Sequence, residues 1–170
     1  MEVLEVASGS GEHLTFFARH EPEIRWQPTD PDPRCLLSID AWRAEQNLPN
    51  LLPALFLDVL KTPWPVEHAD LVLCSNMIHI SHPDTVPALM KGASGLLESG
   101  GKLIVYGPFC VDGKFTSPSN EAFDQSLKMQ NPHWGVRHLE EVAVEAKTEG
   151  LSLIETIPMP ANNLLVVFKK

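Results

Sequence analysis

The sequence predicts an α/β protein in which helices cover both faces of a mostly parallel β-sheet. Short apolar runs alternate with segments that can form helices, and the last two apolar runs follow one another with no room for a helix between them. Alternating strands and helices form a parallel, doubly wound sheet, whereas strands joined by a short loop pair antiparallel. The predicted class is therefore a doubly wound α/β sheet that ends in an antiparallel hairpin.

The individual elements follow from local composition. Apolar runs predict strands at residues 3–6, 24–26, 54–57, 69–74, 102–106, 151–156 and 164–168. Helices are expected at 11–20, 33–46, 85–97, 121–129 and 139–149. Pro63 and Pro65 exclude a regular helix after the third strand, so that connection is expected to be a loop. Ser119 and Asn120 are the expected caps of the fourth helix.

Length and composition limit the functional classes. The 170 residues, 44% of them hydrophobic, suffice for one compact domain spanning 1–170. A net charge of -9 repels phosphate backbones, so nucleic acid is not an expected partner. The three cysteines form no close pair, which predicts neither a disulfide framework nor a metal site and fits a cytoplasmic or nuclear location. No apolar stretch approaches the roughly 20 residues of a membrane-spanning helix.

A glycine-bearing loop at residues 5–11 joins the first strand to the first helix. Its candidate ligand-binding residues are Glu5, Ala7, Gly9 and Gly11. A dinucleotide-binding loop would require glycine or alanine where Leu14 stands, and the Glu5 carboxylate disfavours a phosphate. The same carboxylate attracts the ammonium and sulfonium groups of S-adenosylmethionine, which is therefore the predicted cofactor. The alternative is a glycine-bearing turn that binds nothing.

Polar residues at the ends of the next strands extend this prediction. Asp30, after the second strand, can accept hydrogen bonds from both ribose hydroxyls, or it can simply form a turn or cap a helix. Asp58 and Val59, at the end of the third strand, are expected near the adenine amino group, although an exposed loop aspartate is equally compatible. Asn76 follows the fourth strand and faces the same crevice. His79, about one turn further on, is a candidate catalytic base or a packed histidine.

Several longer blocks closely resemble the methyltransferase-like protein 26 family. These blocks are residues 3–11, 76–79, 106–109, 117–120, 131–135 and 159–163, and they span nearly the whole chain. The resemblance implies a Rossmann-like class I methyltransferase sheet, with Glu5, Gly9, Gly11, Asp30 and Asp58 holding the methionine, ribose and adenine parts of the cofactor. Ala7 replaces the glycine common in this loop among methyltransferases.

Relative to that family, the chain resembles an N-terminally short form. Family members usually carry a helical segment before the first strand, and in many class I methyltransferases such a segment helps to cover the cofactor. The resemblance leaves the substrate and the reaction unassigned.

The candidates for the acceptor pocket follow the carboxyl ends of the later strands. They are Tyr106, which is also a candidate catalytic residue, together with Asn120, Trp134, Asn162 and Asn163. Each has a structural alternative as a packing, capping or turn residue. Asn76 is followed by Met77 and Ile78, so the Asn-Pro-Pro-aromatic signature of many amino-group methyltransferases is absent.

Three functional classes follow from these observations. The first is a methyltransferase acting on a small-molecule or peptide acceptor, since a basic peptide would also suit the acidic chain. The second is a methyltransferase-fold binding or regulatory protein that has lost turnover. The third, an NAD-dependent oxidoreductase, is disfavoured by Glu5 and by the Leu14 spacing.

Overall fold

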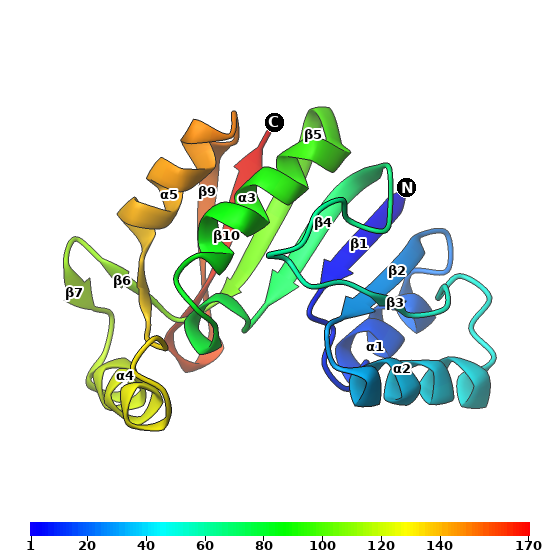
Figure 1. Cartoon of the computed structure of the whole chain (residues 1–170), viewed down its shortest axis with the longest axis horizontal. Helices are drawn as coiled ribbons and strands as arrows, with labels where there is room; N and C mark the ends of the chain where they lie inside the picture. Colours follow the sequence, from blue (N-terminus) through cyan, green and yellow to red (C-terminus); the bar gives the residue numbers. More distant parts are fainter.

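The computed structural model describes all 170 residues and confirms the predicted α/β class (Figure 1). Its main sheet has seven strands in the order β3-β2-β1-β4-β5-β10-β9. Their bounds are β1 Glu2–Val6, β2 Arg25–Asp30, β3 Leu55–Phe56, β4 Ala69–Ser75, β5 Leu97–Gly107, β9 Ser152–Met159 and β10 Asn163–Lys169. The first five strands are parallel, while β10 pairs antiparallel with both β5 and β9. The predicted C-terminal hairpin is confirmed, and β10 inserts between β5 and β9.

All five predicted helices are present. They are α1 Glu12–His20, α2 Pro33–Gln46, α3 Thr85–Leu96, α4 Pro118–Gln130 and α5 Leu139–Thr148, with short 3₁₀ turns η1 Ile78–Ile80 and η2 Pro160–Asn162. None of them is long and apolar enough to cross a bilayer. The segment around Pro63 and Pro65 forms no helix, as its prolines predict.

Helix α4 begins earlier than predicted, and the expected caps were wrong. Its N-cap is Ser117, whose hydroxyl accepts a hydrogen bond from the backbone N–H of Asn120 at 3.2 Å. Ser119 and Asn120 lie inside the first turn. Pro118 occupies the first helical position, where its missing N–H costs no intrahelical hydrogen bond.

A second, smaller sheet was not predicted. It contains β6 Phe109–Val111, β7 Lys114–Phe115 and β8 Arg137–His138, in the order β7-β6-β8. These strands are too short to show an alternating pattern, and β8 pairs with a segment distant in the sequence. The small sheet joins the end of β5 to the start of α5.

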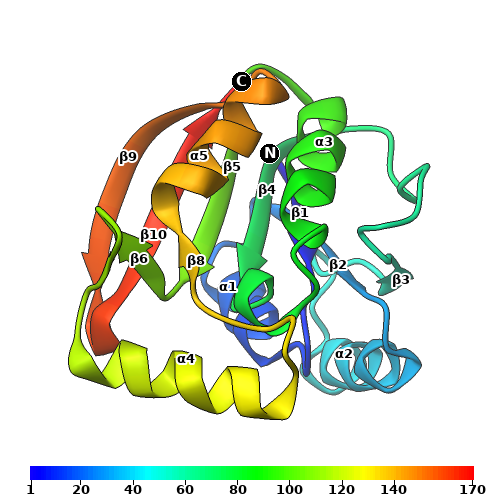
Figure 2. The ribbon, with the colours of Figure 1, turned by 60° about the vertical axis from the view of Figure 1, so that its left-hand side comes forward.

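The two faces of the main sheet are covered unequally. Helices α3 and α5 lie over one face, where 24 buried residues form the larger core cluster (Figure 2). On the other face α1 contributes to a cluster of only five buried residues, centred on β1 and β2. Ile104, Tyr106 and Leu165 of β5 and β10 are only half-buried on that second face. The sheet therefore stays partly open beside its carboxyl edge.

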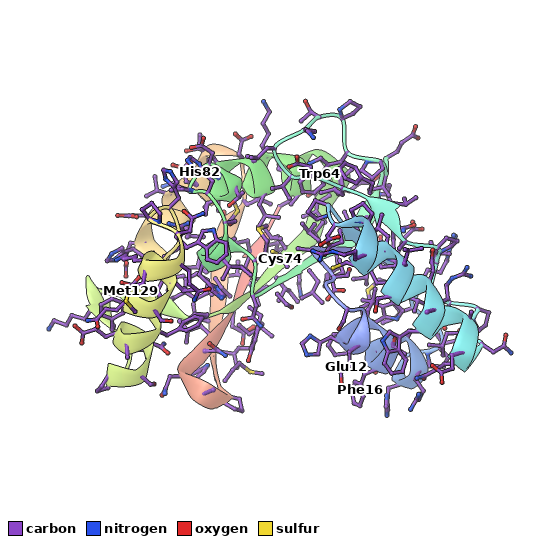
Figure 3. All side chains as sticks on the ribbon, turned by 60° about the horizontal axis from the view of Figure 1, so that its bottom comes forward. Glu12, Phe16, Trp64, Cys74, His82 and Met129 are labelled. Carbon is purple, nitrogen blue, oxygen red and sulfur yellow. The ribbon has the colours of Figure 1, made fainter.

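The loop between β3 and β4 is anchored on α3 by Trp64, which is 9% exposed (Figure 3). A Cβ atom on Gly92 of α3 would lie 2.1 Å from Cζ2 of this indole. No side chain fits between them, so Gly92 is required in mid-helix even though glycine is a poor helix former. Gly95, one turn further along α3, has nothing within 4 Å of the same position.

These two glycines give a matched prediction. Gly92→Ala should lower the free energy of unfolding by about 1–3 kcal/mol because the methyl group overlaps the indole. Gly95→Ala should raise it by up to about 1 kcal/mol because alanine favours the helix. Urea denaturation measures both values. A Gly92→Ala protein as stable as Gly95→Ala would contradict the packing of Trp64 on α3, and adding Trp64→Leu should relieve much of the Gly92→Ala penalty.

Candidate functional site

The loop between β1 and α1 turns through three residues in the left-handed conformation. Their φ angles are 59° at Ala7, 58° at Gly9 and 84° at Gly11. Glycine adopts this region freely, whereas an L-residue such as Ala7 is strained there by roughly 1–2 kcal/mol. At Gly11 a Cβ atom would also lie 2.7 Å from Cγ1 of Ile39 in α2. The loop is therefore held tightly at the base of both helices.

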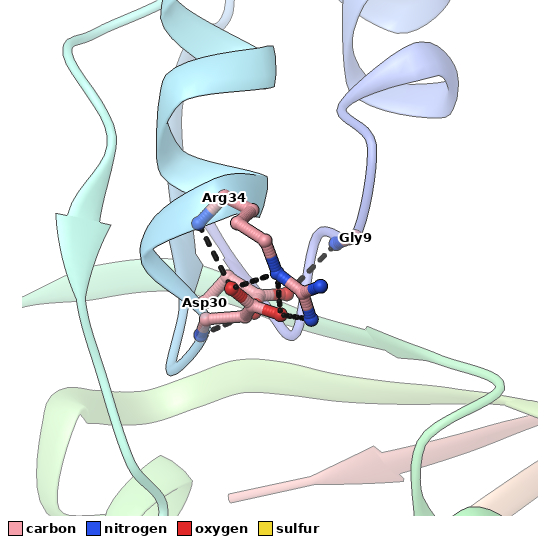
Figure 4. A network of polar contacts seen from close by, with 4 residues as sticks. Gly9, Asp30 and Arg34 are labelled. Carbon is pink, nitrogen blue, oxygen red and sulfur yellow. Dashed lines mark hydrogen bonds and ion pairs between the residues drawn. The ribbon is translucent and has the colours of Figure 1, made fainter.

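Hydrogen bonds fasten this loop to the end of β2. The N–H of Ser8 donates to the Thr29 carbonyl at 2.8 Å, and the Thr29 hydroxyl donates to the Glu5 carbonyl at 2.7 Å. The N–H of Gly9 donates to Oδ2 of Asp30 at 2.9 Å, as Figure 4 shows. The position of the loop thus depends on β2 as well as on its own glycines.

Asp30 is buried and central to this arrangement. Its Oδ1 accepts the N–H of Asp32 at 2.8 Å, while its Oδ2 accepts the N–H of Gly9. Two carboxylate oxygens offer about four acceptor positions, so about two remain for other donors. The helix-capping role that sequence also allowed belongs to Asp32, whose carboxylate caps α2 and pairs with Arg34 at 2.6 Å (Figure 4).

Glu5, at the end of β1, is the most unusual group of the loop. Its side chain is 2% exposed, and Oε2 is buried without a hydrogen-bond partner. Burial raises the pKa of Glu5 from 4.5 to about 7, the charge of Asp30 adds to the increase, and a hydrogen bond from Ser8 opposes it. A buried carboxylate oxygen without a partner is costly, and a cation or N–H donor placed beside it would relieve that cost.

Asp58 does not end a strand, which corrects the sequence prediction. Strand β3 stops at Phe56, and the Asp58 carboxylate accepts the N–H of Leu60 at 3.1 Å and pairs with Lys61 at 3.2 Å. It lines a small hollow of about 90 Å³ with Trp64, while Val59 belongs to the buried core. The hydrogen bond to Leu60 and the ion pair with Lys61 form a turn directly after β3.

Asn76 and His79 line a larger pocket of about 530 Å³ at the carboxyl edge of the sheet. Asn76 has a left-handed φ of 54° after β4, and its N–H donates to the Tyr106 carbonyl at 2.9 Å. His79 is 3% exposed, and its ring forms a T-shaped contact with the Phe123 ring at 5.7 Å between centroids. A Cβ atom on Gly107 would lie 3.2 Å from Cε1 of His79, so Gly107 leaves room for the imidazole.

The predicted asparagines meet at the same pocket. Asn120 of α4, Asn162 of the hairpin turn and Asn163 of β10 all line it. Nδ2 of Asn120 donates to the Asn162 carbonyl at 3.0 Å, which ties α4 to the hairpin, and also to the Thr116 hydroxyl at 2.9 Å, just before α4. Nδ2 of Asn163 donates to the Tyr106 hydroxyl at 2.9 Å.

Tyr106 lines a neighbouring pocket of about 360 Å³, together with His13 and Leu73. Asn76 belongs to both pockets, so the two adjoin at this residue. Trp134, predicted for the acceptor pocket, lines neither of them. Its segment instead contacts η1 through the backbone, where the N–H of Gly135 donates to the His79 carbonyl at 2.9 Å.

Arg137 supports His79 from behind and was not anticipated. Its Nε donates to the Ile78 carbonyl at 2.9 Å and its Nη2 to the Ser81 carbonyl at 2.6 Å, which holds η1 in place. Burial lowers the pKa of His79 from 6.5 to about 4, and the positive charge of Arg137 lowers it further. His79 is therefore neutral at pH 7. Nothing in the spacing of Arg137 in the sequence indicated this role.

Similarity to known proteins identifies the family of this chain. A family model described as "Protein of unknown function (DUF938)" matches residues 1–170. The chain belongs to the DUF938 family.

Solved structures of methyltransferases have the same fold as this DUF938 protein. The S-adenosylmethionine-dependent methyltransferase SibL in its apo form aligns with a TM-score of 0.83 at 22% identity. An O-methyltransferase family 2 protein from Planctomyces limnophilus, in complex with apigenin, aligns at 0.84 and 23%, and PigF with SAH at 0.85 and 16%. Each alignment covers 99% of this chain and 50% of the other, so the chain spans half the length of these proteins. They show the class I methyltransferase fold.

The two buried ionisable groups predict opposite pH dependences of stability. Native Glu5 keeps its proton up to about pH 7. Its contribution to the free energy of unfolding is therefore complete below pH 4.5 and is lost as the pH rises to 7. Native His79 stays neutral down to about pH 4. Its contribution to the free energy of unfolding is therefore complete above pH 6.5 and is lost as the pH falls to 4. Each shift corresponds to a change in unfolding free energy on the order of 3 kcal/mol.

Urea unfolding between about pH 4 and 8 separates the two effects. Relative to wild type, Glu5→Gln should gain stability as the pH rises, and His79→Gln should gain stability as the pH falls. Glu45→Gln, an exposed change on α2, should do neither. If the unfolding free energies of wild type and Glu5→Gln changed with pH in parallel, Glu5 would titrate as an ordinary exposed carboxylate.

Proposed function

We propose that this DUF938 protein is an S-adenosylmethionine-dependent methyltransferase that acts on a small-molecule or peptide acceptor. The observation that carries the proposal is the buried Glu5 carboxylate with its unpaired Oε2, beside a left-handed loop at the carboxyl edge of a class I sheet. Ligands of doubly wound sheets bind at this edge. The ammonium and sulfonium groups of the cofactor are cations that would pair with this unpartnered carboxylate.

The residues present fit this cofactor. Glu5 would bind the positively charged methionine end, and the backbone of Ala7, Gly9 and Gly11 would lie against it. Asp30 has acceptor positions free for two ribose hydroxyls beyond its bonds to Gly9 and Asp32. A phosphate-bearing cofactor is disfavoured because its negative charge would be repelled by the carboxyl groups of Glu5 and Asp30.

The remaining cofactor contacts are assigned by position. Asn76, shared by the two pockets, is proposed to lie between cofactor and acceptor. Asp58 and Val59 are proposed for the adenine end, although the Asp58 carboxylate already binds Leu60 and Lys61.

The mechanism assigned to the chain is mainly alignment. When bound, the cofactor supplies an electrophilic methyl group on its sulfonium, and transfer is an in-line displacement that depends on orientation and on exclusion of water. His79 is the one acid–base side chain that lines the larger pocket, so it is the candidate to receive the proton of the acceptor. Its low pKa makes it a weak base, and its main contribution would be to orient the acceptor by a hydrogen bond. Tyr106 would act indirectly, by holding Asn163.

The finer assignments belong to the same proposal. The motif blocks that resemble the methyltransferase-like protein 26 family support placing the chain in that group within the DUF938 family. We propose that residues 1–170 form one methyltransferase-like domain. Three free cysteines support a reducing, cytoplasmic location.

Calorimetric binding of S-adenosylhomocysteine tests the cofactor site. The wild-type chain should bind it and should not bind NAD. Asp30→Ala should weaken binding at least about tenfold, because a charged hydrogen bond to the ribose contributes about 1.5–3 kcal/mol. Asp32→Ala, which removes the cap of α2 but leaves the Asp30 carboxylate in place, is the matched control and should bind nearly as wild type.

Thermal melts must show that each variant is folded. If the folded wild-type chain binds no S-adenosylhomocysteine, the proposed enzyme function fails and the binding or regulatory alternative replaces it. If NAD binds and S-adenosylhomocysteine does not, an oxidoreductase replaces it.

A further inference from the structure

We propose that the pocket around His79 selects uncharged acceptors with a flat apolar body and a hydroxyl group, and excludes carboxylates and ammonium groups. The inference deepens the proposed function, on which its methyl-transfer step rests, but the binding preference stands on the pocket alone. It decides between the small-molecule and basic-peptide acceptors that composition left open.

The first observation is that the pocket contains no charged side chain. Its 10 lining residues include no Asp, Glu, Lys or Arg, although the whole chain contains 22 acidic and 13 basic residues. The polar side chains are four asparagines, one serine and His79, which is neutral at pH 7. An ion transferred into this pocket would lose its hydration without gaining a counter-ion. A neutral hydroxyl would lose much less hydration free energy.

The nearest charged groups are engaged elsewhere. The Asp124 carboxylate accepts the N–H of Val136 at 2.9 Å and pairs with Lys128 at 2.6 Å. Arg137 donates to backbone carbonyls and has no carboxylate partner. Its positive charge lowers the pKa of His79 and likewise opposes a cation beside that ring.

The asparagine wall offers hydrogen-bonding groups without a net charge. Nδ2 of Asn120 donates both of its hydrogens, to Thr116 and Asn162, and Nδ2 of Asn163 donates one to Tyr106. Nδ2 of Asn162 donates one to the Ser119 hydroxyl at 3.3 Å. The Oδ1 atoms of these three asparagines accept no hydrogen bond within the protein and remain for a ligand. They suit an O–H donor, and no cationic side chain is present to pair with a carboxylate.

Exposed apolar side chains complete the pocket. Phe123 is 40% exposed and Ile80 is 44% exposed, and both line it with Pro108. The Phe123 ring packs against His79 with the two ring planes inclined at 67°, and its exposed part is a flat apolar surface that lines the pocket. A volume of about 530 Å³ lies within the range of small-molecule sites. A flat apolar body would cover these side chains and bring its hydroxyl to His79 and the asparagines.

With the cofactor bound, the acceptor oxygen would form a bond to the methyl carbon as the bond between that carbon and sulfur breaks. The electron pair of the broken bond would go to sulfur, so that the cofactor would leave as a neutral thioether. The hydroxyl proton passes to His79 and then to solvent, so no further reactant is needed.

Three naphthalene probes of equal size test the preference. They are 2-naphthol, 2-naphthoate and 2-naphthylmethylammonium, and their binding is followed by the side-chain amide NMR signals of Asn120 and Asn163. At pH 7, 2-naphthol should bind at least about tenfold more tightly than either charged probe, a difference typical of an ion left unpaired on binding. Equal binding of the three, tighter binding of a charged probe, or no binding of 2-naphthol at about 1 mM would overturn the inference.

A carboxylate added to the pocket by substitution tests the same preference from the protein side. Asn163→Asp adds a carboxylate to the pocket and keeps the bond to Tyr106, whose hydroxyl can donate to it. This variant should bind 2-naphthylmethylammonium about tenfold more tightly than wild type, as expected for a newly paired ion. Gln125→Glu makes the same charge change on the exposed face of α4 and should leave all three affinities unchanged. An equal gain in both variants would show that overall charge, not the pocket, sets the preference.

Binding of S-adenosylhomocysteine is measured on the same samples. If it binds but the naphthalene probes are not distinguished, the acceptor inference fails and the proposed function stands. If the probes are distinguished but S-adenosylhomocysteine does not bind, the proposed function fails and the pocket preference stands.

Discussion

The hydrogen bond from the Gly9 N–H to the Asp30 carboxylate is the contact on which the candidate site depends. It fixes a left-handed loop against the end of β2, and the loop in turn sets where α1 begins and how closely α2 approaches at Gly11. The same carboxylate accepts the N–H of Asp32, so it also fixes the entry to α2. One buried anion thus connects two strand ends and two helices while keeping acceptor positions free.

Burial favours the neutral form of one ionisable group at each end of the site, Glu5 and His79. At the loop between β1 and α1, Asp30 lies beside Glu5, and desolvation raises the pKa of Glu5 to about 7, so that it is partly protonated at neutral pH. In the larger pocket, desolvation and Arg137 keep His79 neutral. A cationic cofactor would therefore be attracted to one end, while the other end offers hydrogen bonds without a net charge. Neither group could have these properties on an exposed loop, because water would screen them.

The unequal covering of the sheet explains why pockets form where they do. The large cluster beneath α3 and α5 provides a rigid base for β4 and β5, from which Asn76, His79 and Tyr106 project. On the opposite face the small cluster under α1 leaves the ends of β5 and β10 half-covered. Helix α4 and the hairpin turn, tied together by Asn120, close another side of the larger pocket. Core packing thus provides stability on one face and access on the other.

The sequence by itself determined the strand and helix alternation, the antiparallel hairpin and the loop at 5–11, because apolar periodicity and glycine placement are local properties. It also identified Asp30, Asn76, His79 and three of the pocket asparagines as residues at strand ends or turns. It could not show that Asp58 pairs with Lys61, that Trp134 does not line the pocket around His79, or that Arg137 donates to the backbone of η1. The small sheet, the insertion of β10 beside β5 and the pKa values of Glu5 and His79 were likewise decided only by the tertiary structure. These features depend on burial and on contacts between segments far apart in the chain, and no short stretch of sequence contains either.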